Sequence, residues 1–280
     1  MPSGTVVAFH AHPDDEALLD AGTLTRAAQA GHRVVLVFAT RGGAGDVGDG
    51  VLARDEALAA RRTLEAEASA RAIGAARVVF LDYQDSGLAP DAAGRWPANA
   101  FCAASVEDAA DDLVAILSEE MAELLIADDR NGGYGHPDHV QVHRVAWAAA
   151  ERTATPLLLA TIDREFLSGG IELAKGMGFD VPEGFVPTDL SSWYTSAADI
   201  THSVDVSSVL TARRASMAAH ATQTTGAPDT VRTLSIFLGL PDEIFAIAFS
   251  LEWFVLANTS ASSSGTLPDS LVDLFTLAPK

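Results

Sequence analysis

The hydrophobic positions of the first 160 residues fall into five short runs separated by longer amphipathic stretches. The runs are rich in β-branched and aliphatic residues, and they occupy residues 5–9, 33–40, 76–83, 123–128 and 156–162. Apolar runs of this length, with few polar interruptions, suit strands that are buried on both faces of a parallel sheet. The Ala- and Leu-rich stretches between them predict helices at about residues 16–30, 51–73, 105–121 and 137–152.

This alternation predicts the fold class. Strands that alternate with helices at such spacing are typical of a doubly wound α/β protein. We therefore expect a Rossmann-like, mainly parallel sheet with helices on both faces, formed by residues 1–162 within a single domain of residues 1–280.

The periodicity weakens after this core. Residues 163–257 predict a C-terminal elaboration, with a helix at about Val206 to Ala221. Within it, the Gly- and Pro-rich residues 168–187 are expected to form a long loop over the site. The polar, low-complexity character of "NTSASSSGTLPDS" predicts that residues 258–280 are a mobile tail.

Composition narrows the class of partner. The chain has 38 acidic and 18 basic residues, a formal net charge of −20, which argues against nucleic acid or an anionic membrane. No apolar stretch approaches about 18 residues, so no membrane span is expected. The first apolar run lacks a basic segment before it, so no signal peptide is expected. The single Cys102 rules out an internal disulfide framework and fits a cytoplasmic protein.

Two similar polar clusters follow two of the predicted strands. "AHPDDE" spans residues 11–16, and "GHPDH" spans residues 135–139. Doubly wound sheets bind their ligands at the carboxyl ends of their strands, where both clusters fall. The sequence therefore places the two clusters in one crevice.

The residue types in the clusters point to a metal ion. Two adjacent carboxylates, Asp14 and Asp15, repel each other unless a cation binds one of them, which leaves the other free to act as a base. Pro137 suits the first position of a helix, so that His136 becomes the N-cap and His139 lies in the first turn. Two histidines and one aspartate form the open ligand set of a catalytic zinc, which lowers the pKa of its water to roughly 7.

Other interpretations of the clusters also fit the residues. A single cluster would suit a helix-capping turn, in which Asp accepts backbone N–H bonds. Two clusters at the ends of two strands of one sheet favour the metal. Fe²⁺ or another divalent ion suits the same ligands as Zn²⁺.

Five motifs together resemble one family. They are "AHPDDE…GTL", "RTLE" at 62–65, "DSGL" at 85–88, "NGGYGHPDH" at 131–139 and "AAHATQ" at 218–223. In this combination the chain resembles the LmbE-like, or PIG-L, family of zinc-dependent N-acetylglucosaminyl deacetylases, and particularly its actinobacterial mycothiol-pathway deacetylase and amidase members.

The resemblance implies a role for each residue of the predicted site. It implies one Zn²⁺ per chain, and it assigns eight residues: His12, Asp15 and His139 as metal ligands, Asp14 as general base, His136 and Tyr134 at the oxyanion, and Arg62 and Asp85 at sugar hydroxyls. The implied reaction is removal of an N-acetyl group from a small amino-sugar substrate.

Two alternatives stay open at this point: an amidase that cleaves a larger acyl group from a glucosaminyl conjugate, and a non-catalytic metal- or sugar-binding protein. A homo-oligomer is compatible with the sequence. Fine specificity depends on residues 41–50 and 163–200, which depart from the family's pattern.

The remaining histidines carry weaker expectations. His10 should point the same way as His12 along a strand and contact the site from behind. His143 has helical spacing from His139, although the three-ligand set is complete without it. His202 and His220 are candidates for lining the cleft.

Overall fold

The structure is a computed structural model that describes residues 4–176, 178, 187, 189–225, 232–257, 259, 267–269 and 271–277. Within these residues, eight strands form one sheet in the order β3-β2-β1-β4-β5-β7-β6-β8. Their bounds are β1 Thr5–His10, β2 Arg33–Thr40, β3 Arg77–Tyr83, β4 Leu124–Asp128, β5 Leu157–Thr161, β6 His202–Asp205, β7 Leu251–Leu256 and β8 Thr276–Leu277.

The first five strands are the predicted Rossmann-like core. β3, β2, β1, β4 and β5 are all parallel, with β1 in the middle between β2 and β4. β7 then pairs with β5 in the antiparallel sense, and β6 and β8 continue that antiparallel edge. The mainly parallel α/β fold is confirmed, and the elaboration after residue 162 extends the same sheet.

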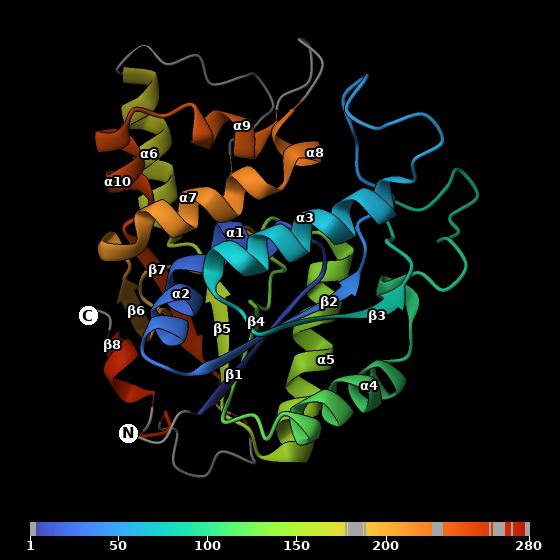
Figure 1. Ribbon diagram of the computed structural model, residues 1–280, viewed down its shortest axis with the longest axis horizontal. Helices are drawn as coiled ribbons and strands as arrows, with labels where there is room; N and C mark the ends of the chain where they lie inside the picture. Colours follow the sequence, from blue (N-terminus) through green and yellow to red (C-terminus); the bar gives the residue numbers. More distant parts are fainter. Residues whose placement is uncertain are drawn as a thin grey trace.

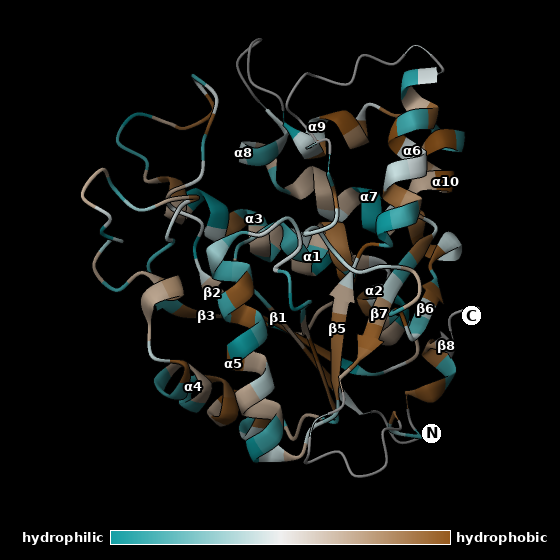
Figure 2. Cartoon of the chain, turned by 180° about the vertical axis from the view of Figure 1, so that it is seen from behind, coloured by the Kyte–Doolittle hydropathy of each residue, from teal (hydrophilic) through white to brown (hydrophobic). Residues whose placement is uncertain are grey.

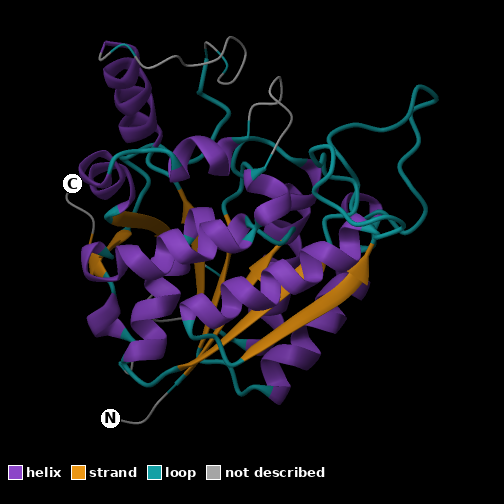
Figure 3. Cartoon of the chain, turned by 45° about the horizontal axis from the view of Figure 1, so that its top comes forward, coloured by secondary structure: helices purple, strands orange, loops and turns teal. Residues whose placement is uncertain are grey.

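Helices cover both faces of the sheet (Figure 3). Their bounds are α1 Asp15–Leu19, α2 Ala21–Gln29, α3 Leu58–Ile73, α4 Val106–Glu119, α5 Pro137–Thr153, α6 Arg164–Gly176, α7 Leu210–Ala219, α8 Ala221–Thr224, α9 Thr233–Leu238 and α10 Asp242–Phe249, with short 3₁₀ turns at Phe101–Ala103, Ser207–Val209 and Val272–Leu274. Among the described residues, no helix combines the length and the apolarity needed to cross a bilayer.

Burial on both faces explains the unbroken apolar runs. Along β1, Val6 and Ala8 pack in the core with α2 and α3, whereas Val7 and Phe9 pack in the core with α4 and α5. Figures 1 and 2 view the sheet from opposite sides, with α3 in front in the first and α5 in front in the second. β1 consequently has no solvent-facing side that would require polar residues.

Two predicted helices differ from the structure at their ends. The helix expected at 16–30 is divided into α1 and α2 at Asp20, whose carboxylate Oδ1 lies 3.2 Å from Nε2 of His10. The helix expected at 51–73 begins only at Leu58, and Asp55 just before it has a positive φ of 65°. Both differences arise from local backbone conformations that interrupt the helical run.

The expected loop at 168–187 is wrong in its first part, because α6 continues to Gly176. Asp163 accepts the N–H of Phe166 in the first turn, and the Phe166 ring packs 5.0 Å from that of Trp253. These contacts outweigh the low helix propensity of Gly169 and Gly170. Most of residues 177–188 lie outside the described residues.

The expectation of a mobile tail does not hold for residues 271–275. Leu271 is fully buried, and Leu274 and Phe275 join the same core as α2 and α3. The remainder of the expected tail lies largely outside the described residues, apart from isolated positions and the short strand β8.

Candidate active site

Both polar clusters lie at the carboxyl ends of neighbouring strands. His12, Asp14 and Asp15 follow β1, and the loop after β4 leads to His136 and His139 at the start of α5. Because β1 and β4 are adjacent and parallel, the two clusters meet at one edge of the sheet. They face a cavity of about 530 Å³ that is also lined by Arg62, Asp85 and Tyr134.

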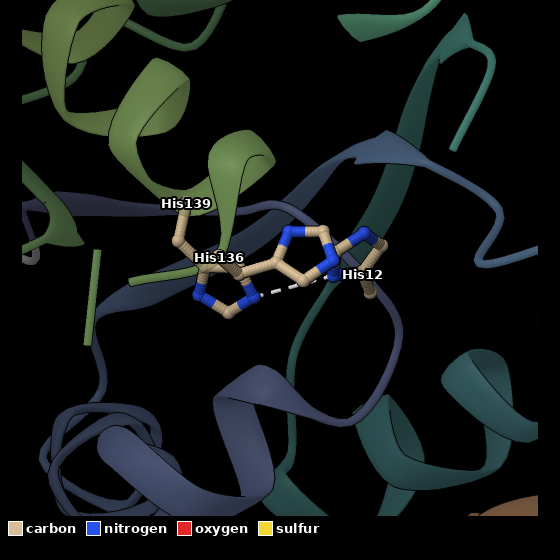
Figure 4. A group of neighbouring side chains, drawn as sticks. All are labelled: His12, His136 and His139. Atoms are coloured by element: carbon tan, nitrogen blue, oxygen red, sulfur yellow. Dashed lines mark hydrogen bonds between the residues drawn. The ribbon is translucent and has the colours of Figure 1, made fainter. Parts of the chain in front are cut away.

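His12, Asp15 and His139 converge on one point. Nδ1 of His12 lies 3.3 Å from Nε2 of His139, the contact that is dashed in Figure 4. Asp15 Oδ1 lies 3.4 Å from His139 Nε2, and its Oδ2 lies 3.7 Å from His12 Nδ1. All three residues are buried, with at most 7% of their surface exposed.

Neighbouring carboxylates fix the proton positions of both rings. Nε2 of His12 lies 3.2 Å from Asp138 Oδ2 and 3.3 Å from Asp85 Oδ1. Nδ1 of His139 lies 2.9 Å from Asp128 Oδ2. Each of these nitrogens lies against a carboxylate, so in the neutral form of each ring with its proton there, the lone pairs of His12 Nδ1 and His139 Nε2 face each other.

This arrangement fits a metal ion. Two facing lone pairs repel unless a proton or a cation lies between them, and a carboxylate completes the set. A tetrahedral ion with bonds of about 2.0–2.1 Å needs ligand atoms about 3.3–3.4 Å apart. The separations of His139 Nε2 from His12 Nδ1 (3.3 Å) and from Asp15 Oδ1 (3.4 Å) match this value. Burial lowers the pKa of the His12 imidazole, but Asp138 and Asp85 outweigh it and raise that pKa to about 10, so positive charge is favoured here. This buried His/Asp cluster is placed to bind a metal ion.

Other donor groups overlap this cluster. The sets close enough to hold an ion within the described residues are His12–His136–His139, Asp15–Asp128–His139, and a third of His12, Asp85, His136 and Asp138. Asp128 approaches the outer nitrogen of His139, and the Asp138 carboxylate is already occupied by the backbone N–H and the hydroxyl of Ser86. His12 and His139 each belong to two of these sets, and Asp15 lies beside both rings.

The sequence interpretation gave no role to Asp128 or Asp138. Asp128 ends β4 and connects the site to the core, because its Oδ1 lies 3.5 Å from Nδ1 of the fully buried His10. His10 in turn contacts Asp20, so a chain of buried groups runs back from His139. A histidine that binds a metal usually has a carboxylate or another hydrogen-bonding partner on its other nitrogen. The last aspartate of "ELLIAD" (Asp128) and the aspartate inside "GHPDH" (Asp138) were therefore the sequence features that could have identified these partners.

Asp14 lies beside the cluster without joining it. Its backbone has an unusual φ of 122°, and its side chain is 20% exposed, at the cavity wall. Burial raises the pKa of the Asp14 carboxyl; Arg62 opposes this shift, and Asp15 adds to it. A carboxyl group with an elevated pKa, next to a cation site, is suited to accept a proton.

His136 and Tyr134 also line the cavity. His136 is the N-cap of α5, as predicted, and its Nδ1 accepts the N–H of Asp138 at 3.1 Å. Burial and the neighbouring His12 and His139 lower the pKa of His136 to about 3, so the neutral ring carries its proton on Nε2. Burial raises the pKa of the Tyr134 phenol above its ordinary value, which keeps it a hydrogen-bond donor.

Arg62 and Asp85 line the same cavity, but their hydrogen bonds go to the protein. Arg62 donates to Asp14 Oδ1 at 2.9 Å, to the Gly42 carbonyl at 3.0 Å and to the Pro13 carbonyl. Asp85 accepts the N–H groups of Ala44 and Gly87. Both residues therefore position the loops around the site.

The other histidines do not face the cavity. His143 Nδ1 lies 3.3 Å from the Asp128 carbonyl, behind the site. His220 is fully buried and pairs with Glu16 at 2.7 Å, and His202 packs near Phe275. Neither His202 nor His220 is among the residues that line the cavity.

Comparison with known proteins places this site in context. Residues 7–150 match the PIG-L family, described as GlcNAc-PI de-N-acetylase. The 1D-myo-inositol 2-acetamido-2-deoxy-alpha-D-glucopyranoside deacetylase of Streptomyces avermitilis is 34% identical over 292 residues, covering 94% of this chain and 95% of the relative. The deacetylase of the same name from Rhodococcus erythropolis is 34% identical over 272 residues, covering 89% of each chain.

The solved structures support the fold. The crystal structure of a conserved protein from Thermus thermophilus has a TM-score of 0.52 and 20% identity, covering 91% of this chain and 94% of that one. At this identity the likeness concerns the fold alone.

Proposed function

This chain belongs to the PIG-L family, and we propose that it is a metal-dependent hydrolase that removes the N-acetyl group from an N-acetylglucosaminyl glycoside or another amino sugar. The observation that carries this proposal is the buried convergence of His12, Asp15 and His139 beside the Asp14 carboxyl, in one cavity. The names of the curated relatives support the same substrate class.

We assign the metal to His12 Nδ1, Asp15 Oδ1 and His139 Nε2, and favour Zn²⁺ because two imidazoles and a carboxylate are its usual catalytic ligands. When bound, zinc supplies a Lewis acid that polarises a carbonyl and acidifies water. Asp128, Asp138 and Asp85 keep the two rings in the tautomers that this binding needs.

The protein groups around this point have separate roles in proton transfer and in stabilising negative charge. Asp14 takes a proton from the attacking water and passes it to the departing amine, which would otherwise leave as an unstable anion. His136, through Nε2–H, and the phenol of Tyr134 donate hydrogen bonds to the oxygen that becomes negative as the amide carbonyl is attacked. We assign sugar hydroxyls to the part of the cavity beside Arg62 and Asp85.

Arg62 should set the pH dependence through Asp14. Its positive charge lowers the pKa of Asp14, so Arg62→Gln should raise that pKa. Because the base acts only when deprotonated, the acid limb of the kcat/KM profile should move to higher pH. Arg61→Gln is the matched control, since Arg61 pairs with Glu56 on the surface. A limb that stays in place or moves to lower pH contradicts this role.

Asp128 should support metal binding without touching the metal. Asp128→Asn keeps the shape but weakens the hold on His139 Nδ1, so we expect metal affinity to fall about 10- to 100-fold, with activity restored by excess zinc. Competition with a chromophoric chelator measures this. Asp112→Asn, at an exposed aspartate of α4, serves as control. If the metal affinity of Asp128→Asn is unchanged, Asp128 does not support metal binding.

A substrate panel tests the reaction itself. The zinc-loaded protein is incubated with N-acetylglucosamine, its methyl glycoside, its inositol glycoside and the corresponding longer N-acyl derivatives, and free amine is quantified. The proposal predicts release from N-acetyl compounds. Release only from longer N-acyl derivatives would make the chain an amidase, and no release from any compound would favour a non-catalytic binding protein.

A further inference from the structure

Arg232 differs from the other buried arginines. Three arginines are buried in the part of the chain that the structure describes: Arg62, Arg213 and Arg232. Arg62 pairs with Asp14, and Arg213 lies 3.3 Å from Glu252. Arg232 has 9% of its surface exposed, and no described carboxylate lies within ion-pair distance of it.

Among the described residues, few groups bond the guanidinium of Arg232. Among the described residues, one hydrogen bond is found, from Nη1 to the Asp46 carbonyl at 2.8 Å, although a guanidinium has five N–H donors. Its Nε, like those of Arg62 and Arg213, is buried without a hydrogen-bond partner in the same part of the chain. A buried charge is costly unless it is paired, and no described carboxylate pairs with Arg232, so an anionic group of a ligand would stabilise this cation.

Arg232 lies on the wall of the cavity that holds the catalytic groups. It reaches this wall with Gln223, Thr233 and Leu234, from the segment around α8 and α9. Gln223 and Arg232 both approach the Asp46 carbonyl, in the loop that follows β2. In Figure 1, α8 and α9 lie in the upper part of the view, and α1, which carries Asp15, lies below them near the centre.

We propose that Arg232 is a specificity-determining residue that binds an oxyanion on the aglycone of the substrate, a phosphate ester or a carboxylate. This inference rests on the proposed function and narrows its substrate class. The planar fork of a guanidinium matches the paired oxygens of both groups, and such charge-assisted bonds are about twice as strong as neutral ones. The amide end of the substrate remains at His136 and Asp14, so Arg232 acts on binding and takes no part in the chemistry.

The test compares substrates that differ only in this group. Amine release by zinc-loaded protein is measured with methyl N-acetyl-α-glucosaminide, N-acetyl-α-glucosamine 1-phosphate and the N-acetylglucosaminide of glyceric acid. The wild type should prefer the two acidic compounds. Arg232→Gln should lower kcat/KM about 10- to 100-fold for them, through KM, and leave the neutral glycoside unchanged. Arg232→Lys should recover part of the loss, and the relative loss on phosphate and carboxylate identifies the preferred oxyanion.

A matched control and a binding readout keep the outcomes distinct. Arg95→Gln removes the same charge from an exposed arginine paired with Asp91, and it should change nothing. Equal losses on neutral and acidic substrates, or a wild type that does not discriminate between them, overturn the proposal. If no compound releases amine, the proposed function fails; calorimetry with glucosamine 1-phosphate then decides the role of Arg232, because equal affinity of wild type and Arg232→Gln refutes it.

Discussion

Asp14→Asn is expected to lower kcat about 10²- to 10⁴-fold while the protein still binds one metal ion per chain. Asparagine keeps the shape of the side chain and accepts the unusual backbone conformation at this position better than alanine would, since φ is 122°. It also retains an oxygen for Arg62, which now bonds Asp14 Oδ1 at 2.9 Å. The substitution thus removes the proton acceptor and little else.

The decisive comparison is between turnover and metal content. Single-turnover kinetics and metal analysis on the same preparation measure both. Loss of turnover with full metal occupancy assigns Asp14 as the base. If the variant instead loses its metal, the roles of Asp14 and Asp15 are exchanged, and the aspartate that faces His139 is not the ligand.

His139→Ala should abolish stoichiometric metal binding and with it the activity. His139 directs Nε2 at His12 Nδ1 from the first turn of α5, so its removal leaves one imidazole and one carboxylate. Two ligands hold zinc far more weakly than three. The cavity left by the ring is itself destabilising, so a folding control is needed.

His143→Ala supplies that control, because it lies one turn further along the same helix. His143 contacts the Asp128 carbonyl and packs near Trp147, outside the cavity. Inductively coupled plasma measurement after gel filtration should find about one metal ion per chain in this variant. If His139→Ala keeps full metal occupancy, or if His143→Ala loses its metal, the metal site does not lie between His12 and His139.

The features that were predictable from sequence are those that depend on short segments. The position of β1 was predictable from its apolar run because every residue from Val6 to Phe9 is buried. His136 was predictable as an N-cap because Pro137 fixes the first position of α5. The meeting of the two clusters followed from parallel neighbouring strands, whose carboxyl ends share an edge.

Other features depend on tertiary contacts that sequence patterns do not encode. Asp20 divides α1 from α2 while it faces His10, a partner supplied by the neighbouring strand. The glycines of α6 predicted a loop, but packing against Trp253 keeps the segment helical. Arg62 also bonds Asp14, which the spacing of "RTLE" did not indicate.

Zinc titration of the metal-free protein, with amine release from an N-acetylglucosaminyl glycoside as the readout, is the most direct test of a metal-dependent deacetylase at this site. We expect no release without metal, a rise in rate as zinc is added, and a plateau at about one equivalent per chain. Release that is undiminished after complete metal removal, or its absence once one zinc is bound, would contradict the assignment of a metal-dependent deacetylase to this site.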